Sequence, residues 1–233
     1  MKIKTKTLTN FLSKVQMNGS QQIMECILDF KDDGLHINAD CPSEQSKSIG
    51  HLKPKAFQEY EVIEKFGVND FDGFIKCLDR FAELVEVKKE GNVLVVTENK
   101  KKVEIELIHT DFIAESKGIP ELEFETTFTL PPKGLQSVFD DANLSKDAII
   151  KIETVTDQIH ISNTGKYKFS NFFEVKGCKA GTKVKFGEPL VESTRKLTGE
   201  LKIQIATDYP MKVTEESDEM CITIIIAPRV EEA

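Results

Sequence analysis

The sequence contains no tryptophan, and only five of its 233 residues are cysteine. The cysteines are odd in number and widely spaced, without a C-x-x-C pair, which argues against disulfides and against a cysteine-based zinc site. No apolar run approaches the roughly 18 residues of a membrane span. Met1 to Lys6 leads into a polar, periodic segment, so no signal sequence is expected. We therefore expect an intracellular protein with reduced thiols and no membrane association.

The sequence also has fewer positively than negatively charged residues. Lysine and arginine total 31 residues against 39 aspartates and glutamates, a formal net charge of −8, and the pI is near 5.2. A protein that grips nucleic acid over its whole surface is usually basic. Any contact with DNA is therefore expected to be local and weak.

Motifs of catalysis are missing as well. The sequence has no G-x-S-x-G, P-loop, H-E-x-x-H or G-x-G-x-x-G string. Its four histidines are scattered, and the acidic pairs fall in expected turns or on helix surfaces. We expect no catalytic residues, no metal site, no cofactor and no enzymatic activity.

A stretch near the midpoint, Glu115–Phe124, divides the chain. Gly118 loosens the backbone and Pro120 favours an extended residue before it, so no helical or strand period is sustained there. Apolar residues within this stretch predict that part of it lies on a domain surface. The expected division is an N-terminal domain 1–114, a connecting loop 115–125 and a C-terminal domain 126–233.

The two halves repeat one pattern. In the first, apolar residues at helical spacing predict a helix over Thr7–Met17, and a second helix is expected to start near Asn69 as its N-cap. The second half has matching helices after Pro131 and at 188–197. Apolar alternation predicts the strands around them, at 2–5, 23–30, 35–38, 48–52, 61–66, 84–88, 92–98, 102–109, 125–129, 149–153, 158–163, 167–175, 183–186, 201–205, 211–214 and 220–226.

Equivalent positions support the repeat. His160 follows His36 by 124 residues, and both alternate with apolar neighbours, which predicts the outer face of a strand. Each half is thus predicted to contain, in order, a strand, a helix, several strands, a second helix and further strands. The expected fold class is α+β, with two similar domains of antiparallel sheet that each carry two helices.

Four short segments resemble segments of a known family. Their order within the repeat supports the resemblance, which extends over the whole chain. Gly118–Phe124, Asp208–Val213, Ile225–Glu232 and Phe74–Cys77 are similar to the connecting loop, a late strand, the C-terminus and the second helix of the sliding clamps of the proliferating cell nuclear antigen type. The resemblance implies the DNA clamp fold. It also implies a DNA polymerase processivity factor that encircles duplex DNA regardless of sequence.

The same resemblance implies assembly of three chains, head to tail, into a ring of six domains with helices lining the hole. A homotrimer is expected, in which strand 102–109 pairs with strand 168–175 of the next chain. The alternative is that both are ordinary edge strands of a monomer. The implied interface residues are Lys102, Glu104, Ile105, Leu107, Phe169, Asn171, Phe173 and Val175.

Cations on the expected helices lie off the apolar stripes, where they can meet phosphates without reading bases. Acidic residues share these helices and dilute the positive field. A solvated helix face is the alternative for any single member. The expected DNA-facing residues are Lys14, Lys76, Arg80, Lys133, Arg195 and Lys196.

Partner binding is implied where the connecting loop crosses the C-terminal strand. Family members receive a short peptide there, with Gln, an aliphatic residue and two aromatics, from polymerases, ligases and nucleases, and a clamp loader is a further implied partner. Ala39–Pro42 departs from the family pattern, so that side of the pocket is expected to differ. The implied pocket residues are Ile119, Pro120, Leu122, Phe124, Pro210, Ile225, Ala227 and Pro228.

Other functions remain open from the sequence. One is a viral-type processivity factor that binds DNA as a monomer or dimer without encircling it, and another is one subunit of a heterotrimeric clamp. A nucleic-acid-processing enzyme with a dispersed active site is opposed by the lack of an acid cluster with metal-ligand spacing. The expected location is the nucleus in a eukaryote, the cytoplasm (nucleoid) in an archaeon, or host-dependent for a virus.

Overall fold

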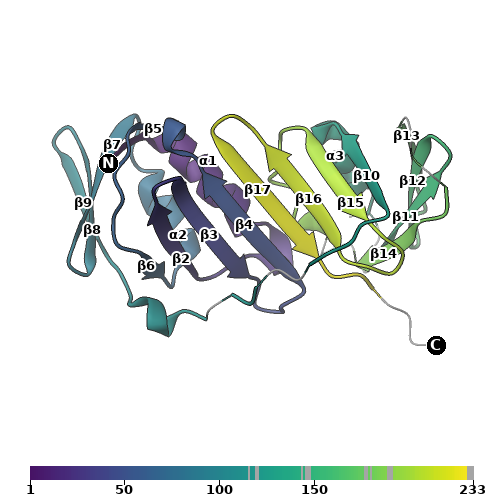
Figure 1. The fold of residues 1–233 in the computed structure, drawn as a ribbon, viewed down its shortest axis with the longest axis horizontal. Helices are drawn as coiled ribbons and strands as arrows, with labels where there is room; N and C mark the ends of the chain where they lie inside the picture. Colours follow the sequence, from purple (N-terminus) through teal and green to yellow (C-terminus); the bar gives the residue numbers. More distant parts are fainter. Residues whose placement is uncertain are drawn as a thin grey trace.

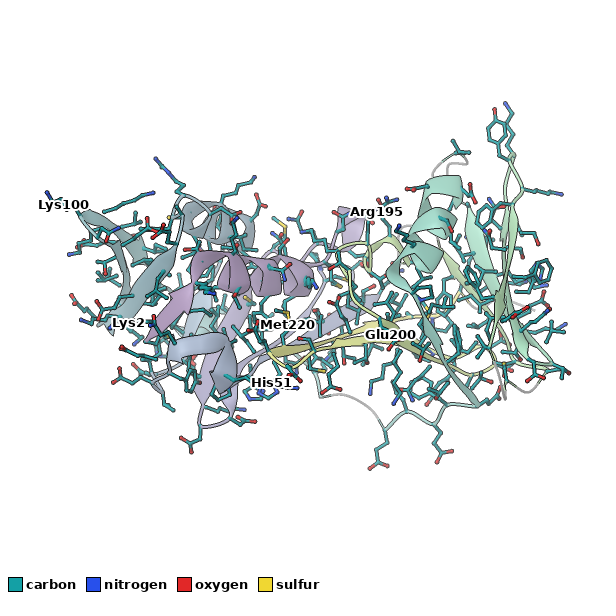
Figure 2. All side chains as sticks on the ribbon, turned by 90° about the horizontal axis from the view of Figure 1, so that it is seen from above. Lys2, His51, Lys100, Arg195, Glu200 and Met220 are labelled. Atoms are coloured by element: carbon teal, nitrogen blue, oxygen red, sulfur yellow. The ribbon has the colours of Figure 1, made fainter. Side chains whose placement is uncertain are left out.

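The computed structural model describes residues 1–114, 116–118, 121–142, 144, 148–175, 178, 180–187 and 191–229. Three antiparallel sheets lie side by side along the long axis, as Figure 1 shows. The middle sheet has eight strands, and the flanking sheets have five and four. The helices cover one face of the sheets and leave the opposite face open (Figure 2). Among the described residues, no helix combines the length and apolarity needed to cross a membrane.

The first half supplies nine strands and two helices, joined in places by short 3₁₀ turns. The strands flank α1 and α2 in the chain. In order the elements are β1 (Lys2–Lys4), α1 (Thr5–Gln16), β2 (Cys26–Lys31), β3 (Gly34–Asp40), β4 (Ser46–Leu52), β5 (Phe57–Glu59), β6 (Phe66–Val68), α2 (Phe71–Leu78), β7 (Leu84–Glu90), β8 (Val93–Glu98) and β9 (Lys101–Glu106).

The second half repeats this order. Its described elements are β10 (Thr126–Leu130), α3 (Pro132–Ala142), β11 (Ile149–Val155), β12 (Gln158–Thr164), β13 (Ser170–Glu174), β14 (Lys183–Gly187), β15 (Leu201–Ile205), β16 (Met211–Glu216) and β17 (Met220–Ile226). Residues 188–190 of the expected fourth helix lie outside the described residues. The part from Val191 to Leu197 makes turns in which the amides of Thr194, Arg195 and Leu197 each donate to a carbonyl three residues earlier.

The periodic elements match the sequence prediction closely. Leu8, Phe11, Leu12 and Val15 of α1 are all buried, which confirms the predicted apolar stripe. The predicted N-cap of the second helix is wrong by one residue: the Asp70 carboxylate, at 2.9 Å, accepts the hydrogen bond of the Gly73 amide. Asp70 has the carboxylate that satisfies an amide of the first turn, so it displaces Asn69 from that role.

Three predicted strands need correction. No strand forms at 61–65, where the chain is exposed or half-buried, and only Phe66–Val68 joins the sheet beside β2. The strand predicted to run to His109 ends at Glu106, because the chain leaves β8 and Ile108 instead bridges to Gly67. The strand predicted over 167–175 is limited to β13, Ser170–Glu174. Alternation alone does not supply a partner strand.

The middle sheet joins the two halves. The last strand of the chain, β17, pairs with β4 over seven residues, from Met220 opposite Leu52 to Ile226 opposite Ser46. Helix α1 crosses this seam at Gly50, where an added Cβ would lie 2.4 Å from Cγ2 of Val15 and 2.9 Å from Cζ of Phe11. The helix sits this close to β4 because position 50 has no side chain.

A buried ion pair also crosses the seam. Lys14 of α1 and Glu215 of β16 are 2.5 Å apart, and their side chains are only 5% and 8% exposed. The second oxygen of Glu215 accepts the amide of Thr198. A buried charge without its partner is strongly unfavourable, so this pair ties α1 of the first half to the second half.

We predict that Lys14→Met lowers the free energy of unfolding by about 3–5 kcal/mol, because it leaves the Glu215 carboxylate buried and unpaired. Lys76→Met is the matched control, since Lys76 pairs with Asp72 at 2.5 Å but is 75% exposed. It should cost less than about 1 kcal/mol. Denaturant unfolding measures both, and equal effects would contradict the role of the buried pair.

Candidate functional site

A surface cavity of about 270 Å³ lies where the connecting segment passes the end of β17. Pro210 leads into β16, Ile225 is near the end of β17, and the amide of Ala227 donates to the Gln45 carbonyl at 2.9 Å. The cavity thus depends on the seam, which brings residues of both halves together in its lining. Its lining residues are Asp40, Glu44, Gln45, Ser46, Lys47, Lys117, Gly118, Pro210, Ile225 and Ala227.

Charged residues fix the connecting segment to the rim of this cavity. The Lys47 ammonium donates to the Ser116 hydroxyl at 2.8 Å and to the Lys117 carbonyl, and it lies 3.3 Å from Asp40. Lys117 pairs with Glu44 at 2.7 Å, and the Glu44 carboxylate raises the pKa of Lys117. The Ser116 hydroxyl donates to Asp40 at 2.8 Å. Residues 116–118 are therefore held against the loop between β3 and β4.

A second hollow of about 280 Å³ adjoins the first. Asp40, Glu44 and Lys117 line both, so the Lys117–Glu44 ion pair belongs to their shared wall. Met24, which is 52% exposed, contributes an apolar surface to the second hollow. Two small hollows with apolar floors and a charged rim suit a short amphipathic segment, since apolar contacts supply affinity and the few charges fix its orientation.

Three of the eight pocket residues named from the sequence line the cavity: Pro210, Ile225 and Ala227. Phe124 instead packs edge-on against Tyr209, with ring centroids 6.3 Å apart. Leu122 and Pro228 are half-buried and do not belong to the lining. Ile119 and Pro120 lie outside the described residues, so their predicted role is untested.

Sequence reasoning missed the charged rim of Asp40, Glu44, Lys47 and Lys117. The only signal was a polar loop after the first hairpin, with acids and lysines close together. This loop reaches the connecting segment because β4 pairs with β17, a contact between distant parts of the chain.

The six cations predicted to face DNA differ widely in their surroundings. The prediction for Lys14 is wrong, because its ammonium is buried against Glu215 beneath the helix. Lys196 is half-buried and donates to Gln16 at 2.9 Å, and burial lowers its pKa. Lys133 and Arg80 are exposed on α3 and just after α2.

The remaining two cations are paired with acids on the helix-bearing face. Arg195 lies 3.0 Å from Asp140 and 3.4 Å from Glu192, and Figure 2 shows it on the same side of the sheets as the helices. Lys76 pairs with Asp72 at 2.5 Å. Acidic neighbours therefore offset the charge of both of these cations.

The residues predicted for a subunit interface lie at the two outermost sheet edges. Lys102, Glu104 and Ile105 are on β9, and Asn171 and Phe173 are on β13. Each of these strands has a neighbour on one side only. The other three lie just outside the strands: Leu107 is buried, and Phe169 and Val175 are half-buried.

Comparison with known proteins finds similarity in structure but not in sequence. No family model matches, and no curated protein is significantly similar. PCNA of A. fulgidus, solved with the C-terminal region of FEN-1, superposes with a TM-score of 0.84 at 19% identity over 100% of this chain and 98% of that one.

Two further structures agree. Proliferating Cellular Nuclear Antigen from Entamoeba histolytica gives a TM-score of 0.82 at 17% identity, with 98% of each chain covered. The PCNA2-PCNA3 complex from Sulfolobus tokodaii gives 0.80 at 19% identity, covering 99% of this chain and 100% of that one. The chain therefore has the α+β fold of the PCNA sliding clamps along its whole length.

Proposed function

We propose that this protein is a non-enzymatic sliding clamp: a ring of three identical chains that encircles duplex DNA and tethers replication and repair proteins. The observation that carries the proposal is that two of the strands at sheet edges, β9 and β13, lie at opposite ends of the long axis, as Figure 1 shows. An uncovered edge favours pairing with a strand of another chain, so these two edges are candidates for a contact between copies.

The internal repeat indicates that the partner of each edge is a second copy of the same chain. The row β1-β7-β8-β9 of the first half corresponds to β10-β15-β16-β17 of the second, and β6-β2-β3-β4 corresponds to β14-β11-β12-β13. β17 and β4 are therefore the equivalents of β9 and β13. Since β17 and β4 pair within the chain, β9 of one copy is suited to pair with β13 of another.

The repeat also supplies a register for this contact. Thr223 of β17 lies opposite Ile49 of β4. When the start of α1 at Thr5 is aligned with the start of α3 at Pro132, the strand registers make Thr223 correspond to Lys102. When His36 is aligned with His160, Ile49 corresponds to Ser170. Lys102 of one copy then faces Ser170 of the next.

The neighbouring residues in this register are complementary. Val103 falls opposite Phe169, and both already pack against the core from one side. Exposed Glu104 and Glu106 fall opposite exposed Lys168 and Lys166. Opposite charges across an antiparallel pair are favourable, whereas like charges repel. Because one chain carries both complementary edges, we infer that it assembles with itself.

A head-to-tail contact generates either a ring or a filament, depending on the rotation between copies. The PCNA fold favours a ring, whose inner wall would be the helix-bearing face with Lys76, Arg80, Lys133 and Arg195. Weak phosphate contacts suffice there, because a closed ring cannot leave DNA sideways. A net charge of −8 fits retention by enclosure better than retention by affinity.

The cavity beside β17 is then the docking site for partner peptides. The A. fulgidus PCNA structure contains the C-terminal region of FEN-1, which supports a nuclease as one such partner. DNA polymerase, ligase and clamp loader are proposed as others. The protein would act where DNA is, in the nucleus of a eukaryote or the cytoplasm of an archaeon.

Charge reversal tests the proposed contact. We predict that E104K/E106K and K166E/K168E each convert a trimer of three 26.3 kDa chains into monomers. The apparent dissociation constant should rise about a hundredfold or more, because facing like charges cost several kcal/mol. The chain with all four substitutions should regain the trimer, as measured by sedimentation.

The control is reversal of Lys88 and Glu86 on the interior strand β7, a pair 2.9 Å apart, which should leave the trimer intact. A wild-type monomer, or a failure of the fourfold variant to reassemble while it remains folded, would contradict the proposed register.

Ala227→Glu tests the docking cavity. A carboxylate placed among Ile225 and Pro210 should weaken binding of a peptide with Gln, an aliphatic residue and two aromatics by more than about tenfold, since a buried unpaired charge is costly. Val62→Glu is the control, because Val62 is 49% exposed and outside the cavity. Fluorescence anisotropy of the labelled peptide measures both. Unchanged binding to the Ala227→Glu trimer would exclude this cavity as the docking site.

A further inference from the structure

A row of metal-binding residue types crosses the outer face of the middle sheet. The strand registers place Asp29 opposite His36, His36 opposite His51, His51 opposite Cys221, and Cys221 opposite Glu216. Directly opposed residues in an antiparallel sheet share a face, so the five form one line across β2, β3, β4, β17 and β16. Figure 2 shows His51 on the side of the sheet away from the helices.

Asp33 in the β2–β3 turn completes a cluster with the two histidines. Its Oδ1 is 2.8 Å from Nε2 of His36, and its carbonyl oxygen is 2.7 Å from Nε2 of His51. The two imidazole rings are stacked, with centroids 4.3 Å apart and an interplanar angle of 15°. One ligand atom from each of the three residues falls within 4.8 Å of the others.

The turn is shaped to hold Asp33 in this place. Gly34 has φ +132°, and an added Cβ would lie 2.2 Å from the Leu52 carbonyl oxygen and 3.1 Å from Nε2 of His51. Only glycine fits a backbone of this conformation so close to β4. The close approach of the turn brings the Asp33 oxygens over both histidines.

We propose that Asp33, His36 and His51 form a binding site for a divalent transition metal ion, with Zn²⁺ as the fitting ion. Two imidazole nitrogens and a carboxylate oxygen are a frequent zinc ligand set, with bonds of about 2.0–2.2 Å. Two ligands of one ion therefore lie at most about 4 Å apart, so the cluster must contract slightly and the stacked imidazole rings must turn until a nitrogen of each points at the ion. The ion would replace the Nε2 protons that now face Asp33.

The site would have three protein ligands and an open position. Asp33 is 65% exposed and the histidines are 28–29% exposed, so water can reach the ion. Cys221 lies opposite His51 in the row but does not belong to the cluster. Asp29 and Glu216 are the two ends of the row and do not belong to the cluster. A bound ion would fasten the β2–β3 turn to β4, next to the seam.

At the equivalent strand pair of the second half, the described residues form no such cluster, and this pair provides a matched control. His160 has the place of His36, but Phe172 has the place of His51, and the two rings stack with centroids 4.4 Å apart and an angle of 9°. A His–Phe stack is thus compatible with this fold at the equivalent strand pair. His51→Phe should remove a ligand while retaining the packing.

Calorimetric titration of the untagged protein with Zn²⁺ tests the proposal. We predict one ion bound per chain, and affinity lower by more than about tenfold in His51→Phe and in Asp33→Asn, because each loses a ligand. His160→Gln should bind as the wild type does. Saturating Zn²⁺ should raise the Tm of the wild type and His160→Gln, and not that of His51→Phe.

Three results would overturn the site: no binding by the wild type at micromolar Zn²⁺, undiminished binding by folded His51→Phe, or an equal loss of binding in His160→Gln. Circular dichroism spectra establish that each variant is folded.

Discussion

The pairing of β4 with β17 holds the two halves of the molecule together. It makes one eight-stranded sheet from strands that belong to opposite halves of the sequence. Gly50 lets α1 lie directly on the seam, and the buried Lys14–Glu215 pair fixes the helix to the second half. The cavity at the end of β17 and the row of ligand residues on the outer face both exist because this seam brings distant segments together.

The same seam explains how one chain can specify an assembly. In the repeat, β9 and β13 correspond to β17 and β4. The contact between β17 and β4 is formed within the chain, so β9 and β13 are suited to form the same kind of contact between two copies. The helices lie on one face of every sheet (Figure 2), which separates a cation-bearing surface from the surface with the cavity. Enclosure of DNA and docking of partners are thereby assigned to opposite faces of the proposed ring.

Local sequence patterns predict much of the fold. The apolar stripe of α1, the hairpin turning at Asp32–Gly34, and the strand Met220–Ile226 each follow from periodicity and turn chemistry that neighbouring residues supply. The predicted domain boundaries at 114 and 126 remain a prediction, and the seam shows that strand pairing does not stop at them. The strand predicted over 61–66 was wrong for 61–65, because an alternating pattern alone does not provide a partner strand.

Features that depend on contacts between distant residues were not predicted from the sequence. Lys14 lies off the apolar stripe and so resembled a surface cation, yet the carboxylate of Glu215 is what permits its burial. The charged rim around Lys47 and Lys117 depends on where the connecting segment runs. The three residues of the proposed metal site come from one turn and two strands, so no local sequence motif indicates them.

Retention on DNA after covalent closure of the ring is the most direct test of whether the protein encircles duplex DNA. Val103→Cys with Phe169→Cys places a thiol on each side of the proposed contact, and oxidation in the presence of DNA should link β9 to β13 of successive copies. We predict that the oxidised protein stays on circular plasmid in high salt and is released when the plasmid is linearised. Equal retention on circular and linear DNA, or no more linkage than in a Val103→Cys, Asn171→Cys protein, would contradict it.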